Sequence, residues 1–110
     1  MIYLYINLNI RICKYMNGKF SPNDFFKALS DPTRLNIVQL LSKQGAMCVC
    51  DITTQLGQPQ PTVSRHLSQL KTQGLLSSER RGTWIWYEID KDLADWCQKV
   101  IELIPDTVSD

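Results

Sequence analysis

Two cysteines separated by a single residue, Cys48 and Cys50, are the side chains of this sequence best suited to chemistry. Thiolates are soft donors, so a Cys-X-Cys pair suits arsenic(III), antimony(III), cadmium or lead far better than magnesium or calcium. Cys50 is expected at the N-cap of a helix that begins at Asp51, where unpaired amides and the helix dipole favour the thiolate. The sequence therefore predicts a soft-metal or metalloid site at a helix start.

The spacing of the pair limits how both sulfurs can bind one ion. In a regular helix the side chains of residues i and i+2 point about 200° apart around the axis. In extended chain they point the same way. Joint ligation therefore requires an extended or unwound helix start. An internal disulfide at this spacing is expected to be strained, so reduced thiols are predicted. A pair that senses oxidation is the alternative.

A third thiolate would complete a trigonal site, and the chain has two further cysteines to supply it. Cys97 is the preferred candidate, within one chain or across a dimer. The equal alternative is that Cys97 is a small apolar residue buried in the dimer interface. Cys13 is the other candidate. If translation begins at Met16, the alternative start, Cys13 is not part of the protein.

Helix signals surround the cysteine pair. Ser21-Pro22 and Asp31-Pro32 each place an N-cap residue before a proline, which is typical of a helix start. Apolar stripes and terminal glycines then predict helices near 22–29, 32–44, 51–56 and 61–73. The last two, joined by a short loop, form a predicted helix-turn-helix whose second member enters the major groove of DNA.

The charges agree with this interpretation. Residues 60–81 carry a net charge of +3, whereas residues 88–110 carry −5, so only the first segment suits phosphates. Base reading is expected mainly from Ser64 and Arg65, and the lone histidine, His66, is expected to contact a phosphate or base rather than to act as a catalyst or ligand. The predicted DNA-binding residues are Gln60, Thr62, Ser64, Arg65, His66, Arg80 and Arg81.

Two strands at 75–79 and 83–89 flank Arg80-Arg81-Gly82 and predict a β-hairpin wing whose arginines hold phosphates or reach the minor groove. Alternation places Tyr87 on the core face and Trp84 and Trp86 on the other. The final helix has an apolar stripe that a second copy would cover, with help from the first helix. The stripe consists of Leu93, Trp96, Val100, Leu103 and Ile104.

The predicted fold class is mainly α with a β-hairpin wing, a winged helix-turn-helix in which the first and last helices form a dimer interface. At 110 residues the chain has room for one domain, which is assigned to 20–106. It lies between an N-terminal extension at 1–19, strand-like or disordered, and a tail at 107–110.

The apolar start of the chain lacks a secretory pattern and is too short to span a bilayer, so a cytoplasmic protein without membrane contact is predicted. One histidine on a DNA-facing helix and no phosphate-binding glycine loop argue against an enzyme.

Over about residues 20 to 104 the sequence resembles the ArsR/SmtB family of metalloregulatory repressors. The resemblance rests on ALSDPTRL from Ala28, CVCDI from Cys48, QPTVSRHL from Gln60 and the wing from Gly74 to Tyr87. It implies a repressor that binds operator DNA as a homodimer and is released when arsenite or antimonite binds cysteine thiolates, with no permanent cofactor and no other protein partner. Similar Cys-Val-Cys segments occur in cadmium and lead sensors, so a response to Cd(II) or Pb(II) is the alternative.

The chain departs from family patterns at two places. Some members have a third cysteine one helical turn after the pair, where this chain has Thr53. The family's zinc site of aspartate and histidine on the last helix is also incomplete, because no histidine lies there. The hypothesis for the switch is that a ligand on both sulfurs distorts the helix start and shifts the recognition helix, so that DNA affinity falls. A coupling free energy of about 1 to 3 kcal/mol between the two sites is enough.

Overall fold

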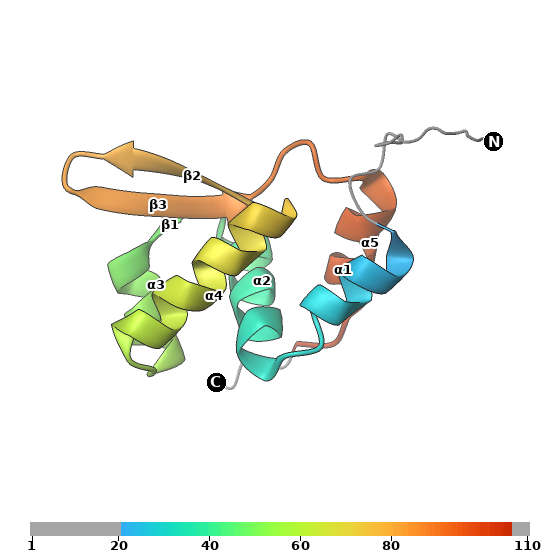
Figure 1. The fold of residues 1–110 in the computed structure, drawn as a ribbon, viewed down its shortest axis with the longest axis horizontal. Helices are drawn as coiled ribbons and strands as arrows, with labels where there is room; N and C mark the ends of the chain where they lie inside the picture. The colour runs from blue at the N-terminus through green and yellow to red at the C-terminus, as the bar shows by residue number, and fades with distance from the viewer. Residues whose placement is uncertain (1–20, 107–110) are drawn as a thin grey trace.

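The computed structural model describes residues 21–106, which form helices and a small antiparallel sheet whose hairpin projects at one end of the molecule (Figure 1). The predictions made for Cys13, for Met16 and for the remainder of 1–19 and 107–110 lie outside the described residues. In chain order the elements are α1 Pro22–Ala28, α2 Pro32–Gln44, β1 Met47–Cys48, α3 Val49–Leu56, α4 Gln60–Gln73, β2 Leu76–Arg81, β3 Trp84–Ile89 and α5 Asp95–Leu103.

The two predicted proline starts are helix starts in the structure. The Ser21 hydroxyl accepts a hydrogen bond from the backbone N–H of Asp24 at 3.2 Å, and the Asp31 carboxylate accepts one from the N–H of Arg34 at 3.1 Å. Each cap satisfies an amide that the first helical turn leaves without a partner. Gly57 and Gly74, with φ of 66° and 96°, end α3 and α4 in the left-handed conformation that glycine adopts at little cost.

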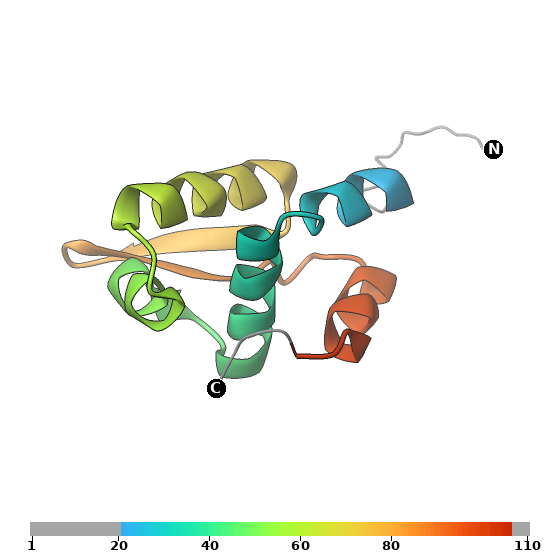
Figure 2. The same cartoon turned by 90° about the horizontal axis from the view of Figure 1, so that it is seen from below.

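One hydrophobic core joins the helices to the sheet. Ile37 of α2, Ile52 of α3 and Leu67 of α4 are all fully buried within it. Figure 2 shows α4 running alongside the hairpin, with α1 and α5 together at the end away from the wing tip. In the described residues no helix is long and apolar enough to cross a bilayer.

The sheet contains one strand more than the sequence predicts. β2 and β3 form a hairpin as expected, but Arg80 and Arg81, predicted in its turn, are the last residues of β2 and pair with β3. β1 pairs with the free edge of β3, giving the order β1-β3-β2. Because β1 ends at Cys48, that residue rather than Cys50 caps α3, and the helix begins at Val49 instead of Asp51. The predicted position of Cys50 at the N-cap is therefore wrong by two residues.

Candidate thiol site and nucleic-acid interface

A strand-to-helix junction brings the two sulfurs of the cysteine pair together. Cys48 is the last residue of β1, with extended backbone angles of −69° and 146°, whereas Cys50 lies in the first turn of α3. The turn of the chain between them brings both side chains to the same side, with their Cα atoms 5.3 Å apart. An extended residue followed by one helical turn thus meets the geometric requirement of the spacing without unwinding the helix.

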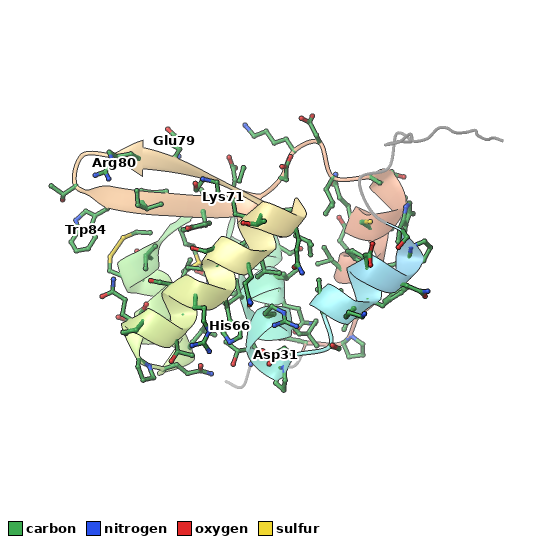
Figure 3. All side chains as sticks on the ribbon, in the orientation of Figure 1. Asp31, His66, Lys71, Glu79, Arg80 and Trp84 are labelled. Atoms are coloured by element: carbon green, nitrogen blue, oxygen red, sulfur yellow. A yellow bond between two sulfur atoms is a disulfide. The ribbon has the colours of Figure 1, made fainter. Side chains whose placement is uncertain are left out.

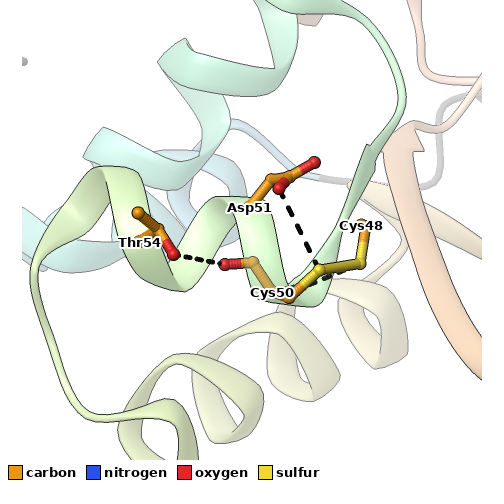
Figure 4. Close-up of a disulfide and its surroundings, with 4 residues drawn as sticks. All are labelled: Cys48, Cys50, Asp51 and Thr54. Atoms are coloured by element: carbon orange, nitrogen blue, oxygen red, sulfur yellow. Dashed lines mark hydrogen bonds between the residues drawn. A yellow bond between two sulfur atoms is a disulfide. The ribbon is translucent and has the colours of Figure 1, made fainter.

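Figure 4 shows how the junction holds the pair. The sulfur of Cys48 accepts a hydrogen bond from the backbone N–H of Cys50 at 3.3 Å, so it serves as the cap of α3. The sulfur of Cys50 lies 4.0 Å from a carboxylate oxygen of Asp51. Cys48 is 3 % exposed and Cys50 is partly exposed, which leaves a reagent a path to the pair through Cys50.

The sulfurs of Cys48 and Cys50 are joined as a disulfide. The prediction of reduced thiols is wrong for this state of the protein. Side chains two residues apart diverge within a helix and point the same way in extended chain, but this pair lies on the boundary between the two conformations. The same proximity that permits the disulfide is what two thiolates need in order to bind one ion.

The structure does not bring the predicted third ligand to the pair. Cys97 is fully buried on α5, and between residues 21 and 106 no group of three histidine, cysteine or acidic side chains is placed to hold a metal ion. Thr53 lies one turn after Cys50, and its hydroxyl is buried without a hydrogen-bond partner in the described part of the chain. A ligand contributed by a second copy stays a prediction.

Burial raises the pKa of the Cys97 thiol from 9.0 to about 11. In the native protein the Cys97 thiol therefore ionises at a higher pH than in the unfolded chain, where its pKa has the ordinary value. The stability that this difference contributes is present below pH 9 and declines as the pH rises toward 11. Urea unfolding at pH 8 and pH 10.5 is expected to give a smaller pH-dependent loss for Cys97→Ala than for the wild type, and equal losses would contradict the assignment.

The recognition helix α4 presents a polar face to solvent. Gln60 and Arg65 are exposed, and Thr62 and Ser64 are partly exposed, so these four predicted DNA-binding residues are accessible. Val63, Leu67 and Leu70 occupy the opposite side and are fully buried. The helix is therefore anchored along one stripe and free to meet a duplex along the other.

His66 lies on the buried side of α4, contrary to the expectation of a DNA contact. It is 8 % exposed, and its Nε2 lies 3.9 Å from the Asp31 carboxylate at the N-cap of α2. Figure 3 labels both side chains. The hydrogen bond from the N–H of Arg34 lowers the pKa of Asp31, and His66 contributes in the same direction. We therefore assign His66 to bracing the recognition helix.

A second contact braces the same region. Thr33 of α2 and Gln58 of the turn between α3 and α4 exchange side-chain hydrogen bonds of 3.3 and 3.1 Å. The turn that sets the angle of α4 is thus attached to the same helix end as His66. Sequence reasoning missed both contacts because the partners are far apart along the chain.

The wing carries two exposed arginines, Arg80 and Arg81, which lie on opposite faces of the hairpin. The guanidinium of Arg81 lies 4.6 Å from the ring centre of Trp86, and its Nε is 3.4 Å from the Glu79 carboxylate. Arg80 pairs across the hairpin with Ile85, on the other face. Trp84, at the start of β3, is 52 % exposed and adds an indole to the surface of the wing.

The residues from Asp31 to Ser78 match the family model described as bacterial regulatory protein, arsR family. An arsenical resistance operon repressor of Escherichia coli is 46 % identical to the chain over 81 residues, which cover 74 % of this chain and 69 % of that protein. The chain belongs to the arsR family. Its members are regulatory proteins, so the prediction that this chain is no enzyme is confirmed.

Two further similarities extend this assignment. A cadmium resistance transcriptional regulatory protein of Staphylococcus aureus is 39 % identical over 67 residues, covering 61 % of this ArsR-family chain and 55 % of that protein. A homodimeric winged helix-turn-helix DNA-binding domain from Mycobacterium bovis superposes with a TM-score of 0.63 at 33 % identity, covering 74 % of this chain and 71 % of that domain. The predicted winged helix-turn-helix fold is confirmed.

Apolar side chains remain exposed where α1 and α5 meet. Phe26 is 50 %, Trp96 37 % and Leu103 82 % exposed. The Phe26 and Trp96 rings have their centres 6.3 Å apart, and Trp96 also packs on the buried Phe25 at 5.0 Å. Figure 1 shows α1 and α5 at the end of the molecule away from the wing, so the exposed rings of Phe26 and Trp96 form an aromatic surface of this ArsR-family chain there.

Proposed function

We propose that this chain is a dimeric transcriptional repressor that binds operator DNA and is released when arsenite or antimonite binds the thiolates of Cys48 and Cys50. The observation that carries the proposal is the proximity of the two sulfurs at the first turn of α3, the helix that precedes the recognition helix. The similarity to an arsenical resistance operon repressor supports the choice of ligand.

The donor set fits a trivalent metalloid. Arsenic(III) supplies a soft centre that forms stable bonds to thiolate sulfur. In the proposed reaction each cysteine exchanges its S–H bond for a sulfur–arsenic bond, and its proton leaves with an arsenite hydroxyl as water, so nothing is oxidised or reduced. The disulfide form must first be opened by a cellular dithiol, which supplies two electrons and two protons and itself becomes a disulfide.

The cysteine pair is coupled to the recognition helix by the packing of α3. Ile52, two residues after Cys50, is fully buried in the core that also contains Val63 and Leu67 of α4. Interiors are close-packed, so a displacement of the first turn of α3 is passed to α4. The contacts of His66 and Thr33 hold α4 in one orientation in the free protein, and this orientation is the one we assign to DNA binding.

In the proposed complex the polar face of α4 lies in the major groove and the wing lies against the backbone. Ser64 and Arg65 read bases, Gln60 and Thr62 support them, and Arg80 and Arg81 contact phosphates or the minor groove. These residues are exposed or partly exposed, in keeping with such contacts. His66 is left out of this set because of its burial.

The dimer would bury the aromatic surface of α1 and α5. The exposed rings of Phe26 and Trp96, and the exposed Leu103 at the end of α5, are apolar side chains that a partner surface would cover. A twofold arrangement would cover them and set two recognition helices about one helical turn of DNA apart. The homodimeric Mycobacterium bovis domain is consistent with this arrangement.

The experiment that tests the proposal compares soft ions. The reduced dimer is bound to a fluorescent duplex selected by the protein from a random pool, and arsenite, antimonite, cadmium, lead and zinc are titrated against it. Arsenite and antimonite are expected to lower the affinity for DNA by about tenfold to a hundredfold, as for a coupling of 1 to 3 kcal/mol. Release by cadmium or lead alone would favour the alternative inducers, and retention with every ion would disprove the proposal.

The disulfide favours a second candidate, a repressor that senses oxidation. Peroxide would remove two electrons and two protons from the pair and leave as two waters, closing the disulfide. Loss of DNA affinity under peroxide, reversed by a dithiol, would support this candidate, provided that arsenite leaves the reduced complex intact. If arsenite releases the reduced complex, the metalloid proposal stands.

A further inference from the structure

A row of side chains crosses the sheet from the cysteine pair to the wing. In the register of the sheet, Cys48 is paired with Trp86, and Trp86 in turn with Glu79 on the next strand. Paired residues on antiparallel strands share a face, with Cβ atoms about 4.5 to 5.5 Å apart. The neighbouring pair, Met47 and Tyr87, is buried in the core, so this row lies on the opposite face.

The far end of the row holds an arginine of the wing. The Trp86 ring supports the Arg81 guanidinium at 4.6 Å, and Glu79 contacts its Nε at 3.4 Å. A cation above an indole and beside a carboxylate has a preferred position rather than a free range of rotamers. Trp86 is therefore the cross-strand partner of Cys48 on one strand and supports the Arg81 guanidinium of the wing.

We propose that Trp86 is a positioning residue that transmits the state of the cysteine pair to the wing. The inference rests on the proposed function, because it assumes that Cys48 binds the inducer and that Arg81 meets DNA. Cys48 is 3 % exposed and its cross-strand partner is Trp86, so a ligand on its sulfur would have to displace neighbouring side chains, the indole among them. The indole moves, and Arg81 loses the support that directs it toward the phosphates.

This route is separate from the one through α3 and α4. It acts on the wing, where contacts are made with the DNA backbone, and so it changes the affinity for every sequence rather than the preference among sequences. The two-residue strand β1 is what creates it, since without β1 the cysteine pair would have no partner on β3. The sequence groups Trp86 with Trp84 but contains no pattern that links either of them to Cys48.

The test measures the ratio of DNA affinities without and with arsenite. Trp86→Leu removes the aromatic support, and its ratio is expected to fall to less than about a third of the wild-type value, while a thiol assay shows the same loading of the pair. Trp86→Phe keeps a ring and is expected to recover part of the ratio. Trp84→Leu is the matched control, because Trp84 lies on the same face and is paired with Arg81 but not with Cys48; this variant is expected to keep the wild-type ratio.

Fluorescence gives a readout that does not depend on DNA release. In a protein with Trp84→Phe and Trp96→Phe, the remaining Trp86 is expected to change its emission when arsenite loads the pair, and a protein that retains only Trp84 is expected to change less. Unchanged Trp86 emission, or a wild-type ratio in loaded Trp86→Leu, would overturn the inference while wild-type release still supports the proposed function. If the wild type is not released, the proposed function fails, and the Trp86 emission alone decides whether the link exists.

Discussion

Cys48→Ser is expected to give a repressor that stays on its operator at arsenite concentrations that release the wild-type protein. The substitution replaces one soft sulfur with a hard oxygen, so the pair no longer binds the metalloid through two thiolates. The wild-type loss of affinity of about tenfold to a hundredfold should shrink to less than about threefold. Anisotropy of a labelled duplex during an arsenite titration measures the difference.

This variant separates ligand binding from folding. The sulfur of Cys48 caps α3 by accepting a hydrogen bond from the N–H of Cys50, and serine is a better N-cap residue than most. The helix start should therefore survive, and thermal unfolding checks that it does. Cys97→Ala removes the buried thiol on α5 and tests the third ligand: an unchanged arsenite response would confine the site to the pair, and a lost response would add Cys97 to it. Release of Cys48→Ser at wild-type arsenite concentrations would rule out the proposed site.

Arg65→Ala is expected to lower the affinity for the preferred duplex by about 1 to 3 kcal/mol and to relax the choice of base at one position of each half-site. Arg65 is exposed on α4, next to the buried His66, so its guanidinium is held at the surface of an anchored helix. A bidentate contact to guanine requires an exposed guanidinium on a helix that is held in a fixed position. Competition binding against duplexes with single base changes measures the effect.

Arg80→Ala provides the contrast. A phosphate contact carries no sequence information, so this variant should bind all duplexes more weakly by a similar factor and reduce the salt slope by about one. Lys91→Ala removes an equal charge from an exposed position beyond the wing, in the acidic part of the chain, and should change neither quantity. An equal loss on every duplex for Arg65→Ala would move Arg65 to the phosphate-contacting group.

Local signals account for much of what could be predicted. A polar cap before a proline, a glycine after an apolar stripe and alternation about a short turn act within a few residues, so α1, α2, α4 and the hairpin could be located from the sequence. The spacing of the apolar residues in α4 also predicts that His66 is buried. It lies three residues after Val63 and four before Leu70, on the same stripe as the buried leucines, but histidine next to an arginine suggested a DNA contact instead.

The sequence by itself determined the chemical character of the protein: a soft-donor pair beside a helix-turn-helix, because donor type and helical period belong to residues close together in the chain. Only the tertiary structure decided where that pair lies. Two residues are too few to have a period, so β1 exists only because β3 offers a free edge, and its formation makes Cys48 the cap of α3 and the neighbour of Trp86. Contacts between distant segments, such as His66 with Asp31, follow from packing, which leaves no local pattern.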